Sequence, residues 1–517
     1  MEIVENMQWP PRGPVEWKMA EHAAWYTGDP LILSNFYSKY ASENPMNLER
    51  TMRIDSFWSR QISNQNDIYT HVPVAGDIAE TSANFLFGES PSIKVNEASK
   101  KETMNQYKET QKRLDDMLME SGFYRKIIEG AEACAALGGI YYKIAWDEEL
   151  SPYPIPVFVQ ADRAIPEFSF GILKAVTFWS VVEIDKSGNT VYRLLERYQK
   201  GAIVTSLYKG TVDRLGTKVA LTDLESTKDI EETVTTVDEL LAGYIPNKLP
   251  NRLDRSSPLG RSDYAGIEML MDNLDETFSS WMTDIAIGQG KIHVPESFLT
   301  INEGKFRYNI DKKVYVKLEM DPTIDGKTIT ATQFSIRAAE FEKTTLNLLD
   351  RIFSLAGYSP QSFGLNIEGR AESGTALGIR ERKSMATKSK KENYWQMALK
   401  RIVKLMSIVY VKELGSKEGS MDPNFTPNIS FNDSLANNLT ELSTSVKMIS
   451  DAQAASTETK VRLLHPDWDE DQIKAEVAAI LEETSVTSLE NPDLFEIPNR
   501  DEDDDQADDK PEGDDEQ

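Results

Sequence analysis

The sequence predicts an α+β fold that is mainly helical. Over several long stretches, apolar residues recur every three or four positions, which is the period of an amphipathic helix. Between Ile140 and about Tyr208 the pattern changes to short runs rich in β-branched and aromatic residues, separated by turns. The chain has 517 residues, too many for one simple core, so roughly three domains are expected.

Helices are expected over much of the N-terminal part. Residues 1–90 are predicted to be largely helical, with a run from Asn47 through Trp58 and a later helix that stops at Gly88. The face of that later helix is formed by Ile78, Ser82, Phe85 and Leu86. Two further helices are predicted over residues 100–137.

A strand-rich segment follows, which we expect to form one sheet or a small barrel-like layer. The predicted strands are Ile140–Trp146, Val157–Gln160, Val176–Ile184, Val191–Tyr198 and Ile203–Tyr208. Residues 187–189, with the sequence Ser-Gly-Asn, are a turn between two of them. Residues 223–239 are acidic and rich in threonine, which predicts an exposed loop.

The clearest amphipathic helix is predicted over residues 262–287. Ser262 or Asp263 can cap its start, and Gly288 can end it. The apolar stripe of this helix consists of Ile267, Leu270, Met271, Leu274, Phe278, Trp281 and Ile285. Its other faces carry the polar residues Glu268, Asp272, Asp275 and Ser279.

A second long helix is predicted after an intervening strand-like segment. In residues 291–335, Val314, Val316 and Leu318 alternate as in a strand, and Asp325-Gly326 is a turn signal. The helix follows from about Ile336 to Ala356. Its apolar stripe is Phe341, Thr345, Leu348, Ile352 and Leu355, and its polar stripe is Glu340, Lys343, Asn347, Asp350 and Ser354.

The C-terminal third is predicted to be helical apart from one loop and the end of the chain. Residues 357–374 hold four glycines and one proline and are loop-like. A long helix follows over about residues 375–414 and another over 434–454, and two short helices are divided at His465-Pro466. Residues 501–517 carry eleven acids against one lysine, which predicts a disordered tail.

Charge and cysteine content exclude several classes of protein. With a net charge of −27, the chain should not grip DNA over its whole surface, although a local basic patch can meet it. Cys134 is the single cysteine, which excludes an internal disulfide and a cysteine-based zinc site and favours a reducing compartment. We expect no secretory signal and no membrane span, because the start is acidic and no stretch approaches roughly 18–20 apolar residues.

Motifs for catalysis, cofactors or metals are incomplete. Gly326-Lys327-Thr328 is similar to the end of a phosphate-binding loop, but Asp321 stands where the motif needs glycine, so a hairpin turn is preferred. Structural or surface roles are preferred for the four widely spaced histidines, His22, His71, His293 and His465. Cys134 lies among apolar helical residues and is interpreted as a core residue. We therefore expect no enzyme, no cofactor and no metal site.

A basic cluster interrupts the acidic sequence between Arg370 and Lys404. Ten Lys or Arg residues and three Glu residues give it a local charge of +7. Two interpretations are open: a solvated helix face that pairs with acidic neighbours, or a contact with phosphates. The candidates for phosphate contact are Arg380, Arg382, Lys383, Lys388, Lys390 and Lys391.

The order of these parts resembles the portal proteins of long-tailed phages, in particular the type from Gram-positive hosts. Three stretches carry the resemblance: HVPVAGDIAETSANFLFGESP at residues 71–91, GRSDY at residues 260–264, and SGTAL at residues 373–377. The sequence LHPDW at residues 464–468 is similar to the end of the portal crown. The resemblance covers about residues 35–485, and it rests on the order and spacing of these stretches.

The resemblance implies a portal-type fold with wing, stem, clip and crown regions. The implied regions are an N-terminal arm (1–34), a wing (35–260), a first stem helix (261–290), a clip (291–335), a second stem helix (336–357), a tunnel loop (358–374), a long spine helix (375–415), a crown (416–485) and an acidic tail (486–517).

The resemblance further implies a ring of about twelve copies at one capsid vertex of the virion, through which double-stranded DNA passes. Its expected partners are terminase, then a head–tail adaptor, together with the major capsid and scaffolding proteins, first in the host cytoplasm. Candidate residues lining the channel are Glu340, Lys343, Asn347 and Asp350 on the second stem helix, and Asn366, Glu368, Arg370 and Glu372 in the tunnel loop. Mixed charges there would let DNA slide, since strong phosphate binding would stall it.

Three alternatives compete with this prediction. Another head–tail connector or minor capsid protein is disfavoured by the length and by the helix pair. A packaging ATPase–nuclease is disfavoured by the failed phosphate loop. An acidic scaffold unrelated to phages is not distinguished by composition alone.

Overall fold

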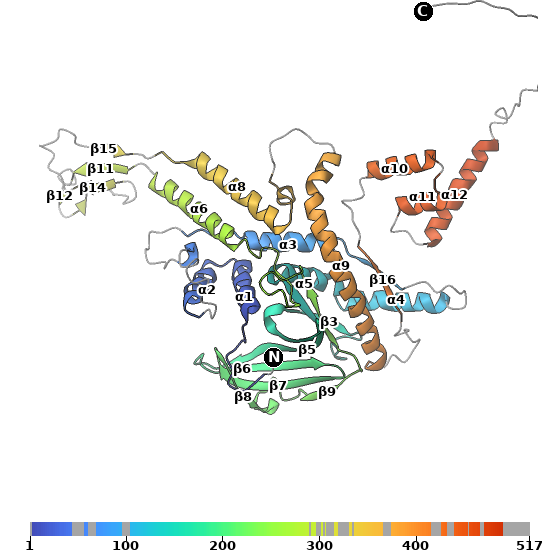
Figure 1. The fold of residues 1–517 in the computed structure, drawn as a ribbon, viewed down its shortest axis with the longest axis horizontal. Helices are drawn as coiled ribbons and strands as arrows, with labels where there is room; N and C mark the ends of the chain where they lie inside the picture. The colour runs from blue at the N-terminus through green and yellow to red at the C-terminus, as the bar shows by residue number, and fades with distance from the viewer. Residues whose placement is uncertain are drawn as a thin grey trace, which may run out of the picture. The chain divides into compact units, whose positions relative to one another are not determined.

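The structure, a computed structural model, describes most of the chain. The described residues are 3–43, 56–59, 69–95, 104–288, 291–295, 301–302, 305–306, 315–318, 330–332, 335–365, 374–414, 425–431, 439–452, 454–465 and 470–489. The chain divides into two compact units, residues 1–432 and residues 433–517. The mixed α+β class is as predicted (Figure 1).

Helices form most of the N-terminal part of the first unit. Their bounds are α1 Pro14–Thr27, α2 Pro30–Glu43, the 3₁₀ turn η2 Phe57–Ser59, α3 Val74–Phe87, α4 Met104–Glu120 and α5 Phe123–Leu137. Helices α1, α3 and α5 contact one another. Ile78, Ser82 and Leu86 are buried on α3, which confirms its predicted inner face. Of the helical run predicted from Asn47 through Trp58, the described part is a single 3₁₀ turn that begins at Phe57.

Helix α5 ends at a position where glycine is required. Gly138 has a φ of 89°, and a Cβ atom there would lie 2.8 Å from the backbone carbon of Arg261. The left-handed conformation and the close backbone approach both exclude a side chain. The chain can therefore turn directly from α5 into strand β2, and the segment before α6 passes against this corner.

The strand-rich segment forms two antiparallel sheets rather than the single layer that we predicted. The smaller sheet has the order β10-β2-β3, with β10 Ala242–Pro246, β2 Gly139–Ala145 and β3 Ile155–Gln160. The larger sheet is a meander of β4 Ala164–Ser169, β5 Ile172–Ile184, β6 Val191–Gln199, β7 Ala202–Thr211 and β8 Arg214–Val219, with β9 Thr233–Thr235 also on β7. Short 3₁₀ turns lie at Ala161–Arg163 and Leu221–Asp223.

Residues 223–239 are mostly exposed, as their composition predicted, but they are not a loop throughout. They contain β9, and Leu224, Thr227 and Val237 are buried. Val237 belongs to the main hydrophobic core, which also receives Val176 and Phe178 from the large sheet. One face of that sheet therefore packs toward the helices.

The first residues of the chain cover the edge strand β8. The backbone N–H of Asn6 donates to the carbonyl of Gly216 at 2.8 Å, and that of Trp9 donates to Asp213 at 2.9 Å. The backbone N–H of Leu215 donates to Met7 at 3.0 Å. Trp9 also packs edge-on against Trp179, with ring centroids 5.6 Å apart. The N-terminal segment thus extends the sheet and is held there by an aromatic contact.

Two long helices, α6 Glu268–Ile287 and α8 Ala338–Ala356, lie side by side and lead to a group of short strands (Figure 1). The strands between them are β11 Lys291–Pro295, β12 Ile301–Asn302, β13 Lys305–Phe306, β14 Tyr315–Leu318 and β15 Thr330–Thr332. Strand β14 pairs with β11 in parallel, and β15 pairs with β11 antiparallel. Strands were predicted here, while the proposed turn at Asp325-Gly326 lies outside the described residues.

Helix α9 spans Gly374–Lys412, close to the predicted bounds of 375–414. Its buried face includes Trp395, Leu399, Ile402 and Met406 in the main core. A 3₁₀ turn, η7 Pro360–Phe363, lies in the segment before it. Strand β16 Pro427–Ser430 follows α9 and pairs with β1 Ser92–Val95, so segments far apart in sequence meet in one ladder.

The second unit contains three described helices, α10 Leu439–Asp451, α11 Thr457–Leu464 and α12 Glu470–Leu489. The hydroxyl of Ser456 caps α11 by accepting the backbone N–H of Thr459 at 3.2 Å. Val461 and Ile473 are buried where α11 meets α12. The division of the last two helices at His465-Pro466 is as predicted, although α12 has 20 residues and is not short. Residues 486–489 of the implied acidic tail belong to α12, and residues 501–517, predicted to be disordered, lie outside the described residues.

Candidate functional site

Helices α6 and α8 form an antiparallel pair tied at one end by an ion pair. Arg337, which precedes α8, donates two hydrogen bonds to the carboxylate of Asp284 near the end of α6, at 3.0 and 3.1 Å. Trp281 and Phe341 stack between the helices, with ring centroids 6.2 Å apart and planes 9° apart. Beside this contact, Glu340, Thr344 and Asn273 help to line a polar cleft of about 400 Å³.

The predicted polar stripe of α8 is accessible. Glu340, Lys343 and Asn347 are exposed, and Asp350 is half-buried. The predicted apolar stripe is wrong at Leu355, whose exposed fraction is 63%. Phe353 is buried in its place and stacks on Phe363 with ring centroids 3.7 Å apart, because the turn after α8 folds back onto this side of the helix. The tunnel-loop candidates Asn366, Glu368, Arg370 and Glu372 lie outside the described residues.

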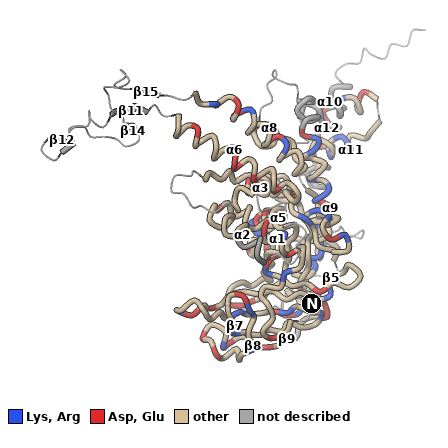
Figure 2. Tube along the Cα trace, turned by 60° about the vertical axis from the view of Figure 1, so that its left-hand side comes forward, with Lys and Arg blue, Asp and Glu red and all other residues tan. Residues whose placement is uncertain are grey.

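The basic residues of α9 divide into an exposed and a buried group (Figure 2 shows Lys and Arg along this helix). Arg382, Lys383 and Lys390 are exposed, whereas Lys388 and Lys391 are buried. The phosphate-contact prediction is therefore wrong for Lys388, which pairs with Glu392 at 3.8 Å, and for Lys391, whose ammonium is bound inside the protein. The side chain of Arg380 lies outside the described residues.

Lys391 belongs to a polar hub, buried except at Lys248, which we define as Ser82, Asn247, Lys248, Asp263, Tyr358 and Lys391. The ammonium of Lys391 lies 2.5 Å from one carboxylate oxygen of Asp263, and that of Lys248 lies 2.9 Å from the other. The hydroxyl of Tyr358 donates to Asp263 at 2.7 Å. The hub joins α3, α9, the segment before α6 and the segment after α8, so both long helices are anchored to the body at one place.

Electrostatics in the hub favour the charged carboxylate. Burial alone would raise the pKa of Asp263, but Lys248, Lys391 and the amide of Asn247 outweigh it and hold that pKa well below its usual range. Burial lowers the pKa of Lys391 to about 8, and the charge of Asp263 opposes that shift. The helix-cap role predicted for Ser262 or Asp263 is wrong, because α6 begins at Glu268 and both side chains bond elsewhere.

The polar side of α6 is mostly buried. Glu268, Asp275 and Ser279 are buried and Asp272 is half-buried. Glu268 lies 3.0 Å from His22 and 3.4 Å from Lys18 on α1. Asp272 accepts hydrogen bonds from the Ser56 hydroxyl at 2.9 Å and the Phe57 backbone N–H at 2.8 Å. We call this the acidic face of α6; it is covered by N-terminal segments of the chain.

Asp275, on the same acidic face, has three hydrogen-bond partners. It accepts hydrogen bonds from the Trp58 indole at 2.9 Å and the Val72 backbone N–H at 2.8 Å, and lies 2.7 Å from Nδ1 of His71. Burial raises its pKa, and His71 opposes the shift. For Glu268, burial is outweighed by His22 and Lys18, so its pKa lies well below its usual range. The structural roles predicted for His22 and His71 are confirmed.

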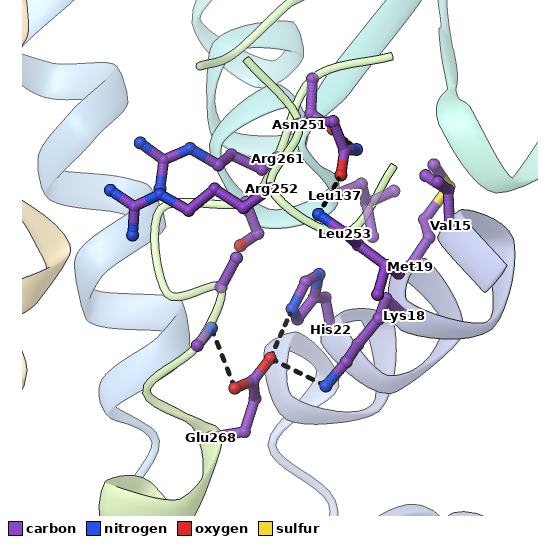
Figure 3. Close-up of a pocket in the computed structure, with 14 residues that line it drawn as sticks. Val15, Lys18, Met19, His22, Leu137, Asn251, Arg252, Leu253, Arg261 and Glu268 are labelled. Atoms are coloured by element: carbon purple, nitrogen blue, oxygen red, sulfur yellow. Dashed lines mark hydrogen bonds and ion pairs between the residues drawn. The ribbon is translucent and has the colours of Figure 1, made fainter. Parts of the chain in front are cut away.

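A pocket of about 240 Å³ lies between α1, the end of α5 and the segment before α6 (Figure 3). Its apolar lining includes Val15, Met19, Leu137 and Leu253. The remaining lining residues are Lys18, His22, Asn251, Arg252, Gly260, Arg261, Ser262, Ala265, Gly266 and Glu268. In Figure 3 the side chains of Arg252 and Arg261 lie side by side, away from the Glu268 cluster. Sequence reasoning missed this pocket, because its walls come from segments more than a hundred residues apart.

Other chemistry has no support among the described residues. Cys134 is buried and free, as expected for a core residue, and burial raises the pKa of its thiol to about 12. Within the described ranges, no three His, Cys, Asp or Glu side chains are grouped as metal ligands. None of the described helices is both long and apolar enough to cross a membrane.

Comparison with known proteins gives the family. The family profile described as "Phage portal protein, SPP1 Gp6-like" matches residues 25–487. No curated protein sequence matches the chain. Among solved structures, the "Neck of empty GTA particle computed with C6 symmetry" matches with a TM-score of 0.37 and 11% identity over 76% of this chain and 90% of that chain.

The family match, which spans most of the chain, defines a structural component of phage particles, the portal protein. Within that class, the chain belongs to the SPP1 Gp6-like phage portal family. The predicted resemblance is confirmed at this level. The protein therefore has the portal function of the family, at the vertex through which the viral genome is packaged.

Proposed function

We propose that about twelve copies of this chain form the ring, with α6 and α8 as the stem and residues 291–335 as the clip. The observation that carries the proposal is the antiparallel helix pair, anchored to the body by the polar hub and tied at its other end by Arg337 and Asp284. A pair fixed at both ends can hold an inserted strand segment away from the body. Side-by-side packing of such pairs around an axis would build a tube.

The polar side of α8 is the proposed channel lining. Glu340, Lys343 and Asn347 are exposed, and together with Asp350 they carry both signs of charge. A mixed lining offers DNA no continuous set of phosphate contacts, so the duplex would slide instead of being held. Asn366, Glu368, Arg370 and Glu372 would surround DNA at the tunnel loop. Exposed cations of α9, including Arg382, Lys383 and Lys390, are the proposed phosphate contacts near that loop.

Each proposed partner is assigned to one region of the chain. The clip would bind terminase during packaging and a head–tail adaptor afterwards, and the wing (35–260) and crown (416–485) would meet the major capsid and scaffolding proteins. Assembly would take place in the cytoplasm of a Gram-positive host. The protein would act without catalysis of its own, since terminase would supply the energy for packaging.

Negative-stain electron microscopy with mass photometry tests the ring. We expect closed rings with a central hole and a mass of about twelve to thirteen chains of 58.4 kDa. If the isolated chain stays monomeric, the measurement is repeated after co-expression with capsid and scaffolding proteins. Monomers under both conditions would contradict the proposal, and ATP hydrolysis by them would point to an enzyme instead.

Replacement of two loop residues tests the channel. Glu368→Ala with Arg370→Ala should reduce DNA packaging, because the proposed mixture of charges around the duplex is lost, while ring assembly stays normal. Packaged DNA per particle is the measurement, and Glu231→Ala with Lys228→Ala, an exposed acid and base on another loop, is the matched control. Normal packaging in the Glu368/Arg370 variant would rule out a role for these residues.

A further inference from the structure

The pocket beside α1 combines an apolar interior with two arginines that form no ion pair within 4.0 Å among the described residues. Its volume of about 240 Å³ is comparable with one or two large side chains. Lys18 and His22, its other basic residues, are already bound to Glu268. The charge available to a ligand therefore comes from Arg252 and Arg261 (Figure 3).

Arg252 and Arg261 are like charges at one end of the pocket. Burial lowers the pKa of Arg261, the positive charge of Arg252 adds to that shift, and the charge of Asp263 opposes it. Nε of Arg261 is buried and has no hydrogen-bond partner. In the described ranges, neither guanidinium lies within 4.0 Å of a carboxylate, although the chain carries 84 acids against 57 bases. A bound anion would relieve the repulsion and satisfy the free donors.

The lining determines which anion fits. A free phosphate or a nucleic-acid backbone could pair with the guanidinium groups, but it would leave Val15 and Leu253, the apolar lining residues that are not already buried, uncovered. A peptide with a large apolar side chain next to a carboxylate would fill the pocket and neutralise the arginines together. The chemistry thus favours an acidic peptide with apolar residues.

The chain itself contains such a peptide after its last described helix. Residues 490–498 read Glu-Asn-Pro-Asp-Leu-Phe-Glu-Ile-Pro, with three acids, three large apolar residues and no base. The following residues, 501–517, are acidic but lack large apolar side chains, so they match the arginines without matching the pocket.

We propose that the pocket between α1 and the segment before α6 binds residues 490–498 of a second copy of this chain. Leu494 and Phe495 enter the apolar part, and Asp493 and Glu496 pair with Arg252 and Arg261. Each copy carries one pocket and one peptide, so the contact joins copies head to tail, as a cyclic assembly requires. The proposal does not depend on which residues line the channel.

Binding of a synthetic peptide tests the pocket. The probe is a fluorescent peptide of residues 489–499, and the binder is the full chain carrying Asp493→Asn and Phe495→Ser, so that its own segment does not compete. We expect saturable binding by anisotropy, weakened about tenfold or more by adding Arg252→Glu and Arg261→Glu, since the paired carboxylates would then be repelled.

Matched variants decide between this site and a general charge effect. Arg255→Glu makes the same charge change in the same segment but outside the pocket lining, and it should leave binding unchanged. A peptide with Phe495→Ser should bind about tenfold more weakly, because the apolar contact is lost. Equal weakening by Arg255→Glu and Arg252→Glu, or no effect of Phe495→Ser, would overturn the proposal.

Disulfide trapping tests the occupant in the full chain. Because Cys134 is buried, Leu253→Cys in one preparation and Phe495→Cys in another introduce single reactive thiols. We expect a reducible dimer when the two preparations are mixed and oxidised, and none when Arg255→Cys replaces Leu253→Cys. A cross-link that forms only when both cysteines are in one chain would show docking within a copy and contradict exchange. If no cross-link forms although the protein still assembles into rings, the contact between peptide and pocket is contradicted, while the portal function is not.

Discussion

The carboxylate of Asp263 has four polar partners in the structure. Two ammonium groups, a tyrosine hydroxyl and an amide converge on its two oxygens, and its backbone N–H donates to Ala135 at 3.0 Å. A buried carboxylate so completely paired is stable as an ion, but removal of one partner leaves the remaining charges without compensation. The side chain is therefore a structural requirement of the junction between helices.

Asp263→Asn should destabilise the folded chain by about 3–5 kcal/mol, because Lys248 and Lys391 then lose their buried counter-charge. The measurement is the urea midpoint of unfolding at pH 7. Asp229→Asn, the same change at an exposed loop position, is the control and should leave the midpoint unchanged. Equal midpoints for both variants would contradict the role given to the hub.

The pH dependence of the same variant gives an independent check within this prediction. The pKa of Asp263 is lower in the folded chain than its ordinary value of 3.8, so its contribution to stability is present above about pH 4 and is lost as the pH falls further. The wild-type midpoint should fall in that range. Asp263→Asn should remove part of this acid-side loss.

The lysines of α9 show the limit of sequence reasoning at this scale. A charge cluster predicts a solvated face or a ligand contact, and Arg382, Lys383 and Lys390 are indeed exposed. Lys391 is buried because Asp263, Tyr358 and Ser82 come from segments distant in sequence and meet around it. No local spacing in the sequence relates those residues to Lys391.

At the scale of elements, the helical period of α6 was predicted correctly, but the burial of its polar side was not. Ile267, Met271 and Leu274 are buried as predicted. The opposite polar residues are also largely buried, because α1 and the segments around Trp58 and His71 supply donors for them. A hydrophobic period identifies a helix but does not tell whether its polar side meets water or another polar segment.

Asp275→Asn should loosen the N-terminal cover of α6. The amide cannot match all three donors that now meet the carboxylate, and leaving buried donors unpaired should cost about 2–4 kcal/mol. Hydrogen exchange should become faster in residues 57–59 and 69–72. Asp229→Asn, the same change at an exposed position outside α6, serves as control, and unchanged exchange in both variants would show that Asp275 does not hold these segments.

In the two antiparallel sheets of the strand-rich segment, strand prediction succeeded for five runs and missed four other strands. Strands β2, β3, β5, β6 and β7 overlap the predicted runs, whereas β4, β8, β9 and β10 were not predicted. Strand β4 contains Pro166 and β8 contains Gly216, residues that disfavour strand interiors in isolation. Pairing with a longer neighbour stabilises them, and such long-range pairing is not encoded in a local pattern.

At the scale of the whole molecule, family membership was predictable because it rests on the order of motifs along the chain. The segments at residues 71–91, 260–264 and 373–377 fall at α3, before α6 and at the start of α9. The pocket and the polar hub were not predictable, since both arise only where these segments meet in space. The overall function could thus be predicted from the order of motifs along the chain. The individual contacts could not, because they form only when the chain folds.

The attachment of the N-terminus to β8 has a consequence for the route to assembly. A meander sheet with an open edge can recruit the same edge of another copy and grow into a fibre. Residues 6–9 occupy the β8 edge with their own backbone, so this edge is not open for such growth. For a portal protein, such protection keeps separate subunits from joining through this sheet edge.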